Sequence, residues 1–291
     1  MRLSAVALVA LLAACSPGPA AAPPSRAAPS EGLPLMRVPG PGRPEAPGRP
    51  NAEMVEDILD LAFALESGRA LPALSRFDGP IRVRVTGPAP ETLVPELQAL
   101  LGRLRDEAGI DVALAAPGEA AAITVEAVPQ ATLTRAAPRA ACFVVPNASS
   151  WREFLRLRGS DALDWARLTR RERAAVLVPA DAPPQEVRDC LHEELAQAIG
   201  PLNDLYRLPD SVFNDDNIHA TLTGFDMLVL RALYALEPGT TRAEAAARLP
   251  AILARLNPAG ERPGRPGADT PPAWVESIET ALADDRPAAQ R

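Results

Sequence analysis

The sequence predicts an α+β domain built on a mixed, mostly parallel five-stranded sheet. Alternating or continuously apolar runs at 81–85, 110–114, 123–128, 142–145 and 174–178 are typical of strands. A helical pattern separates the first two runs and another follows the last, an order that places helices against one face of a mixed sheet. Strong helical patterns at 223–234 and from 241 to about 256 indicate a helical C-terminal subdomain.

The predicted helices follow from apolar spacing and from their end signals. Residues 53–68 repeat apolar side chains at helical spacing up to Gly68, and residues 91–108 do so up to Gly109. The helix at 183–200 opens with two prolines and is ended by Gly200 and Pro201. The last two begin with capping-box signals, at Thr223 and Thr241.

Between the fourth and fifth strands, residues 147–173 carry Trp151, Phe154 and Trp165 among many arginines. One interpretation is a rim that binds substrate. The preferred one is an amphipathic excursion whose aromatic rings pack on the body while the arginines stay in water.

The N-terminal residues form a targeting segment. Arg2 precedes an apolar run that is too short to span a bilayer, and Leu12-Ala13-Ala14-Cys15 resembles a bacterial lipoprotein signal. We therefore expect a lipid on Cys15 and a protein anchored in the cell envelope, facing the periplasm. Ser16 favours the outer membrane. The alternatives are an uncleaved anchor and an ordinary signal peptide.

These features divide the chain into a signal peptide (1–15), a Pro/Ala-rich tether (16–50), the folded domain (51–257), a Pro/Gly linker (258–272) and a C-terminal helix with a tail (273–291). In the last helix Trp274, Ile278 and Leu282 share one face, which we expect to dock on the domain. The net charge of −7 and the scattered arginines argue against nucleic acid as a partner.

Apart from Cys15, the chain has two cysteines, Cys142 and Cys190. In an exported protein such a pair suggests one disulfide, here between a strand and the start of the helix at 183–200. The alternative is two separately buried thiols.

That helix contains His192-Glu193, which begins like the zinc-protease signature H-E-x-x-H, but the fifth position is Ala196. A shift of one residue gives a better match to the metzincin motif H-E-x-x-H-x-x-G-x-x-H. The matching run is Glu193-Glu194-x-x-Gln197-x-x-Gly200-x-x-Asn203. Every ligand position is filled, but none by histidine.

A second match follows downstream. Metzincins have a methionine turn, commonly followed by Leu-Thr-x-x-Asp and a helix that ends in Leu-Tyr. Here Leu222-Thr-Gly-Phe-Asp226 and Leu233-Tyr234 fit that pattern, and Phe213 stands at the methionine position.

Together these motifs resemble a family of uncharacterised bacterial lipoproteins and exported proteins known only as a domain of unknown function, related to the zinc metallopeptidases. The resemblance covers about residues 52–236 and implies a zincin-like fold with no established activity.

Carried over by position, the ligand sites are Glu193, Gln197 and Asn203, and Glu194 takes the place of the general base. Two amides and one carboxylate disfavour zinc and suit calcium better. Without a metal, Glu194 has no acidified water to deprotonate. We therefore expect no zinc and assign no metal ligand.

A polar rim follows, formed by Asp215, Asp216 and His219. His219 would restore zinc chemistry if its loop folded inward, although a histidine bonded within a turn is the plainer interpretation. A calcium site would combine Glu193, Gln197, Asn203, Asp215 and Asp216. A polar network in which Gln197 and Asn203 bond to Glu193 and Glu194 is the other alternative.

Three functional hypotheses result. The first is a tethered pseudo-metallopeptidase whose cleft binds a peptide or an envelope protein without cleaving it. The second is an active metal-dependent peptidase with Glu194 as base. The third is a structural envelope lipoprotein.

Overall fold

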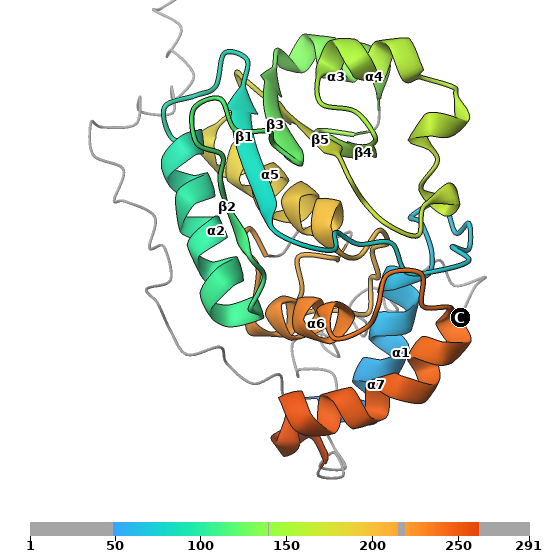
Figure 1. Ribbon diagram of the computed structural model, residues 1–291. Coiled ribbons are helices and arrows are strands. Elements are labelled where there is room, and N and C mark those ends of the chain that lie inside the picture. The colour runs from blue at the N-terminus through green and yellow to red at the C-terminus, as the bar shows by residue number, and fades with distance from the viewer. Residues whose placement is uncertain (1–48, 139, 215–218, 262–291) are drawn as a thin grey trace, which may run out of the picture. The chain divides into compact units, whose positions relative to one another are not determined.

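The computed structural model describes residues 49–138, 140–214 and 219–261. Its sheet contains β1 (Ile81–Thr86), β2 (Val112–Leu114), β3 (Ile123–Val128), β4 (Phe143–Pro146) and β5 (Ala174–Pro179). The strand order is β2-β1-β3-β5-β4, and all neighbours are parallel except β4, which runs antiparallel to β5 at one edge (Figure 1). The predicted mixed, mostly parallel five-stranded sheet is confirmed.

Helices cover both faces of the sheet, whereas the sequence predicted helices on one. Val176 and Val178 of β5 belong to the main core, with α2 (Leu93–Ala108) and α5 (Pro184–Ile199). Ala175 and Leu177 point the other way, into a smaller core with α3 (Gln130–Ala136) and α4 (Trp151–Leu157). Successive side chains of β5 therefore pack alternately on two layers of helices, which lie on opposite faces of the sheet (Figure 1). The two short helices were missed because seven residues hold too little periodicity.

Three further helices lie beyond the end of the sheet: α1 (Asn51–Ala62), α6 (Gly224–Tyr234) and α7 (Arg242–Leu256) (Figure 1). The predicted capping boxes are present, Thr223 with Asp226 at α6 and Thr241 with Glu244 at α7. The chain then continues into a 3-10 turn, Pro258–Glu261. Glu261 accepts a hydrogen bond from Asn51, so the first residues of the predicted linker pack on the domain.

The first helix ends at Ala62, six residues before the predicted end at Gly68. The chain turns back there, because Ala64 and Ala70 form an antiparallel bridge and Gly68 takes a positive φ of 76°. Leu65 continues the helical spacing, which explains the overestimate. The turn carries Glu66 and Ser67 toward α5.

The aromatic residues of the segment 147–173 have two different environments. Trp151 and Phe154 form an aromatic cluster with Phe143 on the second core, as expected for an amphipathic excursion. Trp165, by contrast, lines a pocket.

The signal peptide, the tether up to residue 48 and the predicted helix with Trp274, Ile278 and Leu282 lie outside the described residues. The last tether residues pack on the domain, since Arg49 forms an ion pair with Asp57. Within the described ranges, no helix has the length and apolar character needed to cross a membrane.

Candidate functional site

Helix α5 is the element on which the site is built. Pro184 opens it where an N–H has no helical partner, and Leu191, Leu195 and Ala198 are buried in the main core. Gly200 ends the helix with φ of −148°, outside the left-handed region. A glycine is needed there for space, because a Cβ would come within 2.7 Å of Leu230 Cδ2 on α6.

Arg171 fixes the end of this helix, a role that no sequence pattern indicated. Its side chain is buried and donates to Gln197 O at 2.5 Å and Gly200 O at 2.6 Å. It also donates to Ser75 Oγ and stacks 4.7 Å from the centre of the Trp165 ring. Burial lowers the pKa of Arg171 to about 9, so it remains a cation at neutral pH at the negative end of the helix dipole.

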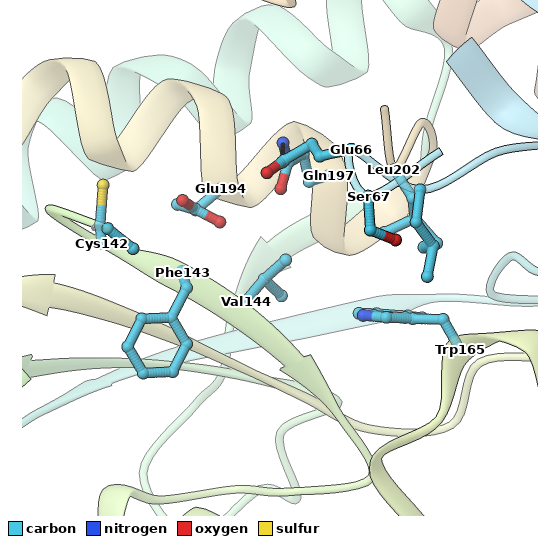
Figure 2. A pocket seen from close by; sticks show the side chains of 11 residues that line it. Glu66, Ser67, Cys142, Phe143, Val144, Trp165, Glu194, Gln197 and Leu202 are labelled. Carbon is cyan, nitrogen blue, oxygen red and sulfur yellow. Dashed lines mark hydrogen bonds between the residues drawn. The ribbon is translucent and has the colours of Figure 1, made fainter. Parts of the chain in front are cut away.

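A pocket of about 270 Å³ lies between α5 and the outer edge of β4, and Figure 2 shows it from close by. Helix α5 contributes Glu194 and Gln197, and the turn after α1 contributes Glu66 and Ser67. The remaining lining residues are Leu65, Ala140, Cys142, Phe143, Val144, Trp165 and Leu202.

Glu194 is the buried acid of this pocket, with an exposure of only 6%. Its carboxyl accepts a hydrogen bond from the N–H of Val144, whereas its Oε2 has no hydrogen-bond partner among the described residues. Burial raises the pKa of Glu194 well above its ordinary value, and the neighbouring carboxyls of Glu193, Glu66 and Asp204 raise it further. The side chain is therefore neutral well above pH 4.5.

Two connections hold the pocket walls together. Gln197 Nε2 donates to Glu66 Oε1 at 3.0 Å, which joins α5 to the turn after α1. The disulfide between Cys142 and Cys190 joins the start of β4 to α5 and confirms the predicted pairing. The bond therefore fastens opposite walls of one pocket.

The other predicted ligand positions lie apart from this pocket. Glu193 is half-buried on α5 and does not line it. Asn203 donates from its Nδ2 to Asp60 O, at the end of α1, at 3.1 Å. The side-chain amide of Asn203 is thus bonded to the backbone of α1.

Two of the remaining predicted site residues, Phe213 and His219, lie within the described ranges. Phe213, at the methionine-turn position, is fully buried in the main core. His219 contacts Pro209 O through Nε2 at 2.8 Å, in accord with the plainer interpretation of a histidine bonded within a turn. Asp215 and Asp216 lie outside the described residues.

The described residues do not suit a zinc site. Within them, no three His, Cys, Asp or Glu side chains converge to hold a metal ion. Of the three former ligand positions, only Gln197 lines the pocket, and its amide is bonded to Glu66. Because two of the five residues in the predicted calcium cluster lie outside the described ranges, that cluster stays a prediction.

The opposite side of α5 carries His192, which the motif analysis had set aside. It is buried, and its Nδ1 accepts the N–H of Leu222 at 3.2 Å. The proton of the neutral ring is therefore on Nε2, which lies 3.4 Å from Glu96 Oε1. Burial lowers the pKa of His192, while hydrogen bonds from His192 and Arg188 lower the pKa of Glu96 to about 2.

The Leu-Thr-x-x-Asp segment, residues 222–226, holds the preceding loop in place through Asp226. Asp226 is buried and accepts hydrogen bonds from Ser211 Oγ, Val212 N and Thr223 N. Burial raises its pKa to about 6. These bonds tie the loop that contains Phe213 to the start of α6.

Because helices cover both faces of a mostly parallel sheet, the domain is mixed α/β and not α+β as predicted, and its acidic pocket lies at the antiparallel edge strand. The chain belongs to the family described as "Protein of unknown function (DUF2927)", which matches residues 51–251. Neither a curated protein nor a solved structure shows a significant match to the chain.

Proposed function

We propose that this chain is a lipid-anchored envelope protein whose pocket binds an extended peptide segment of a partner without cleaving it. The observation that carries the proposal is the pocket itself. It joins an edge strand to a buried carboxyl at the position where a related peptidase would hold its general base.

The edge of β4 supports peptide binding. Among the described strands, β4 pairs with β5 alone. Val144 directs its N–H toward Glu194, and the N–H and C=O of one strand residue point to the same side. The C=O of Val144 therefore faces the pocket side, where an added strand finds an acceptor.

The chemistry of the residues at the predicted ligand and base positions argues against cleavage. A zinc peptidase needs basic ligands for the metal and an ionised glutamate that takes a proton from the bound water. Gln197 offers an amide, Asn203 is engaged with α1, and buried Glu194 resists ionisation. The zincin relationship rests on the two motifs and on the order of strands and helices.

The anchor is argued from the first residues alone, because Cys15 follows a short apolar run and precedes a Pro-rich stretch. A tether of this composition would hold the domain away from the membrane.

Peptide binding is tested with the full chain in detergent and a fluorescent, N-acetylated, C-amidated hexapeptide library that is equimolar in all residues except cysteine. We expect saturable fluorescence polarisation. We also expect a matched library with alternate backbone nitrogens methylated to bind much more weakly, because methylation prevents strand pairing. Equal binding of the two libraries would contradict the strand-edge mode.

Cleavage is tested on the same protein after dialysis. We expect less than stoichiometric zinc and no release of fluorescent fragments from labelled casein. Stoichiometric zinc, or cleavage that Glu194→Gln abolishes and Glu193→Gln preserves, would favour an active peptidase.

The anchor is tested by growing cells with a labelled fatty acid. Label and membrane association should be present in the wild type and absent in Cys15→Ser. A wild-type chain that is exported without label would contradict the anchor.

A further inference from the structure

We propose that the group received by this pocket is a cation, the side chain of a lysine or arginine of the bound peptide. This inference rests on the proposed peptide binding and adds the chemical class of the ligand. It starts from Glu194, a buried carboxyl with one oxygen unpartnered, which Figure 2 shows among the pocket side chains.

The charges around the pocket favour a cation over other ligands. The described lining residues include two carboxylic acids, Glu66 and Glu194, and no basic residue. Glu193 and Asp204 add negative potential at Glu194 from outside the lining. The ionised carboxyls would repel an anionic ligand, and a neutral apolar one would leave the Glu194 oxygen without a partner.

The size of the pocket favours a single side chain. About 270 Å³ is slightly below the range typical of sites for drug-sized ligands. The walls suit the long stem of lysine or arginine, since Val144, Leu202 and Trp165 provide apolar surface while the carboxyls provide the polar end. Trp165 already stacks with one guanidinium, that of Arg171.

Binding of the cation would be coupled to a proton. Four groups face the Glu194 carboxyl: Glu193 on the same helix, Glu66 and Asp204 on adjoining loops, and the Val144 N–H on β4. The three carboxyls oppose its ionisation, whereas an incoming ammonium or guanidinium stabilises the charged form. The carboxylic proton would then leave to the solvent as the ion pair forms.

The test uses the full chain in detergent and four peptides of the form acetyl-Ala-Ala-X-Ala-Ala-amide, in which X is lysine, arginine, norleucine or glutamate. We expect the lysine and arginine peptides to bind at least tenfold more tightly than the norleucine and glutamate peptides at pH 7. Calorimetry in two buffers of different ionisation enthalpy should show proton release with the cationic peptides only.

Variants locate the effect. Glu194→Gln should abolish both the cation preference and the proton release, and Glu66→Gln should weaken the preference. Glu56→Gln removes the same charge from an exposed position on α1 and should change neither. A preference that persists in Glu194→Gln would overturn the assignment of the cation to this pocket.

The outcomes separate this inference from the proposed function. Equal binding of the lysine and norleucine peptides would overturn the cation and leave peptide binding intact. If no peptide binds, n-butylammonium and n-propylguanidinium are tried as free cations by thermal shift. Stabilisation of the wild type but not of Glu194→Gln would support the cation site and overturn peptide binding, and no stabilisation would overturn both.

Discussion

On one side of α5, buried His192 meets the partly buried Glu96 of α2, and both side chains have hydrogen-bond partners. On the other side, two residues further along, Glu194 is buried among carboxyls and has an unpartnered oxygen. The same helix thus holds two buried ionisable groups under opposite electrostatic conditions. The first arrangement stabilises the fold, whereas the second leaves a carboxyl oxygen without a partner at a cost in stability, as the proposed ligand site requires.

The largest effect should come from the disulfide that joins the pocket walls. Replacing both Cys142 and Cys190 by alanine opens a loop with a sequence separation of 48. The entropic model gives a loss of about 4 kcal/mol in the free energy of unfolding. Urea unfolding followed by circular dichroism measures it, and a reduced wild type should match the variant. Equal stability of oxidised and reduced wild type would contradict this account.

The second largest effect should come from Glu96→Gln, on the side of α5 where His192 and Glu96 have hydrogen-bond partners. The pKa of Glu96 is lowered from 4.5 to about 2, so its contribution to stability is present above pH 4.5 and is lost as the pH falls toward 2. At pH 7 we expect a loss of about 2 kcal/mol after allowing for partial solvent screening. Thermal unfolding at pH 3, 5 and 7 should show that the difference in stability between the wild type and the variant becomes smaller at low pH. A difference that is independent of pH would mean that the charge of Glu96 is not its cause.

The same substitution on the pocket side, Glu194→Gln, should have the opposite sign. Because the folded-state pKa of Glu194 is raised, the contribution of this group to stability is most favourable below pH 4.5 and falls as the pH rises. The variant lacks this dependence, so it should be more stable than the wild type at pH 7, and the difference should grow with pH by at most about 1.4 kcal/mol per unit. Glu56→Gln is the matched control, and a Glu194→Gln protein less stable than the wild type at pH 8 would refute the comparison.

The smallest effect should follow from Gln197→Ala. The lost bond to Glu66 lies at the pocket mouth, where Glu66 is exposed, so we expect a loss of about 1 kcal/mol or less. Hydrogen exchange should nevertheless increase in the turn at 64–70, because that bond joins the turn to α5. Unchanged exchange there would show that the bridge between Ala64 and Ala70 suffices to hold it.

Local patterns predicted the strands and the long helices closely, because alternation and helical spacing are properties of neighbouring residues. The first helix was extended too far since Leu65 fits the spacing although the chain has already turned. The antiparallel direction of β4 is a tertiary property that no run of residues reports.

The site was predicted only in part, for a similar reason. Glu194 and Gln197 share one helix and the cysteines form a countable pair, so sequence reasoning found them. Glu66 contacts Gln197 across a separation of 131 residues, and Arg171 lies in an Arg-rich stretch that looked like solvent-exposed surface. Their roles arise only when the turn after α1 and the end of α5 come together.

The disulfide also changes the topology of the molecule. It closes residues 142–190 into a covalent ring that contains β4, α4 and β5, and α5 continues beyond this ring at Cys190 to carry Glu194 and Gln197 into the opposite wall of the pocket. A protease that nicks the long connection at 147–173 would open the ring once without releasing either wall. The nicked chain would run as one band without reductant and as two with it. A domain tethered outside the cytoplasm, as we propose for this chain, would in this way keep its pocket assembled after a cut that separates an open chain into two pieces.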